Sequence, residues 1–145
     1  MANTPVTRVA VAEDESFLTK HDHHIRQDVL GRLIRAGQIL VVEDEEILAG
    51  WLRWNLFWDE IPFMNMLFVL EHHRGRVLGG ALMEAWESTV KKKGYTVVMT
   101  SSQSDEKAQH LYRKCGYVDC GVLLLPDQAA EVVFRKELDD RVAAE

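Results

Sequence analysis

The chain of 145 residues carries 17 basic and 23 acidic residues, which gives a formal net charge of −6. Its length suits one domain, and a hydrophobic content of 47% can form a core of ordinary size. A surface that follows nucleic-acid phosphates needs clustered Lys and Arg, so this charge balance argues against a nucleic-acid partner. We expect a single domain over residues 1–145.

Apolar runs and cysteines exclude two further classes of protein. The longest apolar runs, Met66 to Leu70 and Val122 to Leu125, are too short to cross a bilayer. The first eleven residues also lack the pattern of a signal peptide. Cys115 and Cys120 are the only cysteines, which argues against a disulfide scaffold or a four-ligand metal site. We predict a cytoplasmic protein with neither a membrane partner nor a bound metal.

The amino-terminal half alternates between strand and helix patterns. Residues 6–11 predict a strand. Asp14 is expected to cap a short helix, and Asp22 a second helix that ends at Gly37. Three further strands, which we expect to form an antiparallel meander, are predicted over residues 38–43, 47–57 and 63–70.

The carboxyl-terminal half continues the alternation. Apolar residues four apart predict a helix from Leu78 to Gly94, and the strand that follows over 95–101 should lie parallel to the strand at 63–70. A last helix and two closing strands are predicted over residues 108–115, 117–125 and 130–137. These elements predict an α/β (α+β mixed) fold with a central mixed, mostly antiparallel sheet flanked by helices.

The loop after Leu70 is the first candidate for a ligand site, because ligands bind beyond the carboxyl ends of parallel strands. It contains Arg74, Gly75, Arg76, Val77, Leu78, Gly79 and Gly80 and opens a helix directly. Small residues let the backbone approach an anion, and the free N–H groups of the first helical turn attract negative charge. We interpret the loop as a pyrophosphate site. The alternative is that the glycines only shape a turn and close helix packing.

Two segments resemble motifs of the GNAT acetyltransferase superfamily. Arg74 and Gly79, preceded by Leu67, Phe68 and Val69, are similar to its motif A. Val77 stands where that motif usually has its first glycine. The second segment is similar to the family signature Asn-x-x-Ala-x-x-x-Tyr-x-x-x-Gly-Phe, here with the residues Asp105, Ala108, Tyr112, Gly116 and Tyr117. Asp105 replaces the usual Asn and Tyr117 the usual Phe.

The resemblance implies the GNAT fold, with acetyl-CoA or CoA as co-substrate. The pantetheine arm is then expected between two parallel strands that splay apart at a bulge near Phe68 and Val69. The implied cofactor-binding residues are Leu67, Phe68, Val69, Arg74, Gly75, Arg76, Val77, Leu78, Gly79, Gly80, Asp105 and Ala108. Tyr112 is implied as the general acid that protonates the leaving thiolate.

The resemblance further implies an amine acceptor, which is a small molecule or a peptide. Trp54, Asn55, Asp59 and Asn65 would line the acceptor cleft, although core packing is the alternative for the indole of Trp54. The strand at 63–70 begins without a carboxylate, so we predict a proton relay through water. An apolar strand near the carboxyl terminus could support a homodimer. A catalytically silent acyl-CoA binding or sensing module and a partner-binding domain without cofactor are the competing hypotheses.

Overall fold

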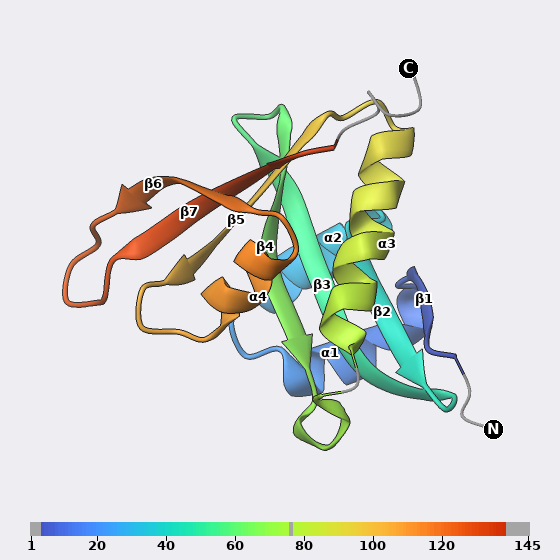
Figure 1. The fold of residues 1–145 in the computed structure, drawn as a ribbon. Helices are drawn as coiled ribbons and strands as arrows, with labels where there is room; N and C mark the ends of the chain where they lie inside the picture. The colour runs from blue at the N-terminus through green and yellow to red at the C-terminus, as the bar shows by residue number, and fades with distance from the viewer. Residues whose placement is uncertain (1–3, 76, 139–145) are drawn as a thin grey trace. The chain divides into compact units, whose positions relative to one another are not determined.

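The computed structural model describes residues 4–75 and 77–138. Within them, seven strands form a mixed sheet in the order β1-β2-β3-β4-β5-β7-β6, and helices flank it (Figure 1). The elements are β1 Val6–Val9, η1 Ala12–Asp14, α1 Glu15–His21, α2 Gln27–Arg35, β2 Ile39–Asp44, β3 Ile47–Phe57, β4 Ile61–Val69, η2 Glu71–His73, α3 Leu78–Lys92, β5 Val97–Gln103, α4 Ala108–Lys114, β6 Val118–Leu123 and β7 Glu131–Glu137. The predicted fold class is confirmed.

The chain divides into two compact units. The first comprises residues 1–54 and 66–86, and the second comprises residues 55–65 and 87–145. The organisation as a single domain stays a prediction.

The apolar core of the first unit includes side chains from both faces of β3. Trp51 joins a buried cluster with α1 and α2, and its ring meets that of Phe17 edge-on at 6.0 Å between centroids. Side chains alternate across a strand, and Trp54 accordingly contacts Trp86 of α3, with ring centroids 6.5 Å apart. The strand is therefore covered on both sides, which explains its nearly continuous apolar sequence.

Buried carboxylates tie the first helices to the sheet. Asp14 occupies the predicted N-cap position of α1 but makes no capping hydrogen bond with that helix, and the cap predicted at Asp22 is wrong because Arg26 precedes α2 instead. Asp22 ends α1, and its Oδ2 accepts hydrogen bonds from Arg53 Nε at 2.7 Å and from Trp51 Nε1 at 3.1 Å. Asp14 binds the Arg8 guanidinium through both oxygens and accepts the Val11 N–H. Each carboxylate binds an arginine side chain, because a charge removed from water needs a partner of opposite sign.

The second unit contains the predicted parallel pair of strands. Phe63 pairs with Met99 and Met64 pairs with Thr100 in parallel, which confirms the expected crossover. β7 lies antiparallel to both β5 and β6, so that β6 is the outer strand of the sheet. Every residue of β6 is exposed. A homodimer formed through this strand stays a prediction.

Among the described residues, no helix has the length and apolar character that a membrane crossing requires. A cytoplasmic location stays a prediction.

The ion pair between Asp22 and Arg53 should contribute strongly to stability. Replacement Asp22→Asn leaves the buried guanidinium without a counter-charge, and we expect the free energy of unfolding to fall by about 3 kcal/mol. Urea denaturation followed by fluorescence measures this loss. The matched control is Arg26→Gln, which removes an exposed ion pair with Asp28 and should leave the midpoint unchanged. Equal losses in both variants would contradict this account.

Candidate active site

The loop between β4 and α3 has a strained backbone at one residue. Val77 has a φ of 57°, which is the left-handed region that β-branched residues avoid. It occupies the position where the GNAT motif usually has glycine, the residue for which a positive φ carries no steric cost. Gly75 also has a positive φ, of 82°. A Cβ added at Gly80 would meet no atom within 4 Å, so the first turn of α3 faces open space there.

Arg74 is held against the carboxyl end of β4. Its Nε donates to the carbonyl oxygen of Val69 at 2.8 Å, and its guanidinium lies 5.1 Å from the ring centroid of Phe68. Trp51 stacks on the same Phe68 ring, with centroids 5.0 Å apart. These contacts place a cation at the start of the loop, where an anion would be bound. The sequence did not indicate the role of Trp51.

The close approach of β3 to this end of β4 requires a glycine. A Cβ at Gly50 would lie 2.6 Å from the Phe68 carbonyl oxygen and 3.2 Å from Val69 Cα. Any other residue at this position would clash with the backbone of β4 and force it to move. Gly50 thereby allows the backbone at Phe68 and Val69 to take its present path. The predicted bulge and the cofactor contacts of Leu67, Phe68 and Val69 stay predictions.

Tyr112 projects from α4 into the core of the second unit. Its side chain packs against Phe134, and the residue is only 6% exposed. The Tyr112 hydroxyl forms a hydrogen bond with Thr100. Thr100 Oγ1 in turn donates to the Met64 carbonyl oxygen at 2.9 Å. The phenol therefore lies beside the pairing of Met64 with Thr100, after which β4 and β5 continue to Val69 and Gln103.

Burial makes the Tyr112 phenol hold its proton more tightly than an exposed tyrosine does. Loss of hydration is the main cause that raises the pKa of Tyr112 to about 12, and the hydrogen bond with Thr100 acts in the opposite direction. A group that stays protonated at neutral pH is able to donate a proton to a thiolate. Sequence reasoning missed Thr100, because a threonine in a β-rich segment is accounted for by strand propensity alone.

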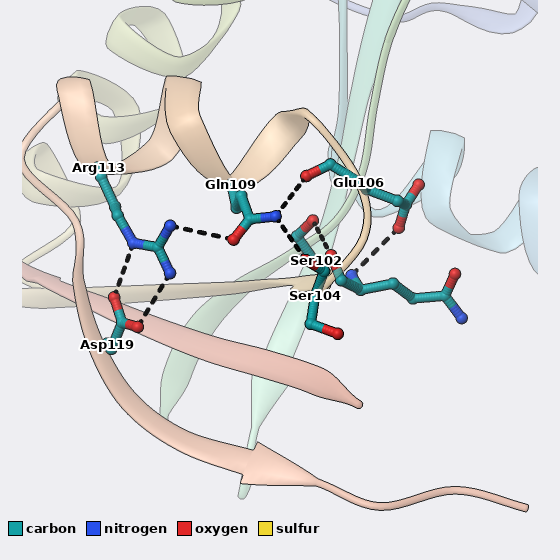
Figure 2. A network of polar contacts seen from close by, with 7 residues as sticks. Ser102, Ser104, Glu106, Gln109, Arg113 and Asp119 are labelled. Carbon is teal, nitrogen blue, oxygen red and sulfur yellow. Dashed lines mark hydrogen bonds and ion pairs between the residues drawn. The ribbon is translucent and has the colours of Figure 1, made fainter. Parts of the chain in front are cut away.

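A network of side-chain contacts fixes the turn between β5 and α4 (Figure 2). Gln109 Nε2 donates to the carbonyl oxygens of Ser104 and Glu106 at 2.8 and 2.7 Å. Arg113 joins Gln109 to Asp119 on β6. Asp105 lies exposed in this turn, and Ala108 begins α4. The network therefore anchors the segment that carries both residues, whose contact with a cofactor stays a prediction.

The residues predicted for the acceptor have different environments. Asn65 Nδ2 donates to Asn55 Oδ1 at 2.6 Å, which brings these two side chains together across β3 and β4. Both line a cavity of about 380 Å³ in the second unit. Asp59 lies exposed in the turn before β4, with a φ of 60°. Trp54 is 4% exposed and packs in the core of the first unit.

Tyr117 explains one departure from the family signature. Its hydroxyl donates to Glu87 Oε2 at 2.8 Å, and Lys136 Nζ donates to Glu87 Oε1 at the same distance. The hydroxyl absent from the usual phenylalanine thus joins the segment between α4 and β6 to Glu87 of α3, which also binds Lys136 of β7. Arg76, which was also predicted to bind the cofactor, lies outside the described residues. Across residues 4–75 and 77–138, no cluster of His, Cys, Asp and Glu is arranged to hold a metal.

Comparisons with known proteins agree with this arrangement. The family profile of the acetyltransferase (GNAT) domain matches residues 35–119, more than half of the chain. The chain therefore belongs to the GNAT family and is an acetyltransferase. No protein of curated function matches the sequence.

Solved structures share the fold at low sequence identity. Ard1 from Thermoplasma volcanium is 18% identical, with a TM-score of 0.81 over 95% of this chain and 100% of the other. YncA from Salmonella typhimurium, whose structure holds its cofactor acetyl-CoA, is 17% identical, with a TM-score of 0.77 over 95% and 96%. The ribosomal-protein-S18-alanine N-acetyltransferase from Escherichia coli is 12% identical, with a TM-score of 0.75 over 94% and 95%.

Replacing Val77 should test the strain in the loop. We expect Val77→Gly to raise the free energy of unfolding by about 1 kcal/mol, because the strain removed exceeds the added entropy of the unfolded chain. The side chain is 81% exposed, so little packing is lost. Val77→Ala is the control: it removes the branched side chain but retains a Cβ, and should gain less. Urea denaturation measures the change. A lower free energy of unfolding in Val77→Gly would contradict the proposal that the backbone is strained at Val77.

Tyr112 should also leave a signature in the pH dependence of stability. Its folded-state pKa of about 12 lies above the ordinary value, so the folded state holds the proton more tightly. That contribution is complete below about pH 10 and falls by about 1.4 kcal/mol per unit as the pH rises towards 12. Urea denaturation from pH 9 to 11 should therefore show a steeper loss in the wild type than in Tyr112→Phe. Parallel pH profiles would argue against the buried phenol.

Proposed function

We propose that the protein transfers the acetyl group of acetyl-CoA directly to an amine of a small-molecule or peptide acceptor. The observation that carries this proposal is the position of the buried, protonated Tyr112 phenol. It is hydrogen-bonded to Thr100, which pairs with Met64 between β4 and β5. The family match and the loop at the start of α3 support the identity of the donor.

The donor supplies an activated acetyl group as a thioester. The first turn of α3 fits its pyrophosphate, because the turn faces open space at Gly80 and carries the unpaired N–H groups of a helix start. Arg74 adds a positive charge at the entrance of the loop. The backbone N–H groups of Phe68 or Val69 would polarise the thioester carbonyl. Leu67, Leu78, Gly79, Asp105 and Ala108 complete the proposed cofactor set, together with Gly75 and Val77.

The residues of the chain account for the proton transfers. The amine nitrogen forms a bond to the carbonyl carbon, and the C–S bond breaks with its electron pair on sulfur. Tyr112 donates its hydroxyl proton to that sulfur, while the nitrogen loses one proton to water. Water then returns a proton to Tyr112, so the reaction needs no further reagent. The strand β4 offers amides and carbonyls but no carboxylate at its start, which favours the water relay.

Replacing Tyr112 separates this function from that of a silent acyl-CoA module. Tyr112→Phe keeps the ring in the core, and we expect kcat to fall by about a hundredfold or more while the Kd for CoA is unchanged. Thiol release with an amine panel reports turnover, and calorimetry reports binding. An unchanged kcat would remove Tyr112 from the mechanism. Binding of CoA without turnover in the wild type would favour the silent module.

The matched control is Tyr117→Phe. It also removes one buried phenolic hydroxyl, from a ring 6.1 Å from that of Tyr112, and restores the residue usual in the family signature. We expect this variant to retain turnover. A loss equal to that of Tyr112→Phe would show that the effect comes from disturbed packing. If calorimetry with the folded protein detects neither acetyl-CoA nor CoA, the proposed function is wrong.

A further inference from the structure

The cavity in the second unit is lined mainly by apolar side chains. The rings of Phe57 and Phe63 face it, with centroids 5.8 Å apart, and Trp58 adds a third aromatic side chain at 4.6 Å from Phe57. Leu123 and Val133 contribute aliphatic groups from β6 and β7. Its volume of about 380 Å³ is in the range of sites for small molecules.

Two amides supply the polar groups of this cavity. The hydrogen bond from Asn65 to Asn55 uses one donor and one acceptor, and each amide has further hydrogen-bonding capacity. All of the lining residues are described by the structure, and none of them is charged. A second cationic group of an acceptor would find no counter-charge among them, so its burial would be costly.

We infer that this cavity binds the uncharged aromatic ring of a small amine acceptor, while the pair Asn55 and Asn65 orients a polar substituent or the amine itself. The inference rests on the proposed function and names the substrate class of the same reaction. Aromatic rings suit the lining because they pack edge-on or offset against Phe57, Trp58 and Phe63.

The position of the cavity agrees with the proposed chemistry. Asn65 directly follows Met64, whose carbonyl oxygen accepts the hydrogen bond from Thr100, and Thr100 is bonded to Tyr112. The cavity therefore lies one residue along β4 from these contacts, and its Asn65 side chain leaves the strand on the face opposite to that of Met64. Uncharged surroundings also disfavour an ammonium ion relative to the free amine. An apolar cavity therefore helps to provide a neutral nucleophile where β4 offers no carboxylate.

A pair of primary amines tests the inference with the full chain. Phenethylamine carries an uncharged ring, whereas putrescine carries a second cation. With acetyl-CoA as donor, we expect kcat/KM to be at least about tenfold higher for phenethylamine, because the cavity buries its ring. Equal or better acetylation of putrescine would overturn the inference and leave the proposed function intact. Failure to bind CoA would refute the proposed function instead.

Two neighbouring substitutions identify the cavity as the site of the ring. Leu123→Trp introduces bulk into the lining, and we expect KM for phenethylamine to rise at least about fivefold with little change in the Kd for CoA. The control Leu124→Trp adds the same side chain at an exposed residue outside the lining and should leave KM unchanged. Equal KM values in the wild type and Leu123→Trp would overturn the assignment of this cavity.

Saturation-transfer NMR gives a readout that does not depend on turnover. In the presence of CoA, saturation of protein methyl groups should reach the ring protons of phenethylamine, and Leu123→Trp should weaken that transfer whereas Leu124→Trp should not. This measurement decides the outcome if neither amine is acetylated. Transfer that the Leu123 variant weakens supports the inference, and absence of transfer in the wild type overturns it.

Discussion

The hydrogen bond from Thr100 Oγ1 to the Met64 carbonyl oxygen is the contact on which the proposed chemistry depends. It joins the parallel strands β4 and β5 beside the Met64–Thr100 pair. Thr100 is also hydrogen-bonded to the Tyr112 hydroxyl, so one side chain both contacts β4 and positions the proposed acid. Because Tyr112 is buried against Phe134, the phenol has little freedom to leave this arrangement. Strand pairing thus fixes the position of Tyr112, the proposed acid.

The order of elements followed from local patterns in the sequence. Helix stops at Gly37, Gly94 and Gly116 were correctly predicted, and each of these residues has the positive φ that such a stop requires. The long apolar run of residues 47–57 gave the bounds of β3, and the four-residue spacing after Leu78 gave α3. These features depend on interactions between residues close in the sequence, which single-sequence reasoning can evaluate.

The errors and omissions arose from contacts between distant residues. Asp22 has the chemistry of a helix cap, but its carboxylate binds Arg53 instead. Nothing in the neighbouring sequence of Asp22 indicates that Arg53, 31 residues away, competes for it. Thr100 was missed for the same reason, since its partners come from β4 and α4. Such pairings become visible only when the strands are brought together.

Val77 has a backbone conformation that suits glycine better than valine. A positive φ has no steric cost for glycine, whereas Val77, with a φ of 57°, is conformationally strained. The loop retains that conformation, so contacts elsewhere in the first unit must outweigh the cost. The bond from Arg74 to Val69 and the packing of Phe68 between Trp51 and Arg74 fix the preceding residues. A backbone held in this way leads into a first turn of α3 that faces open space at Gly80, which is the property that an anion site requires.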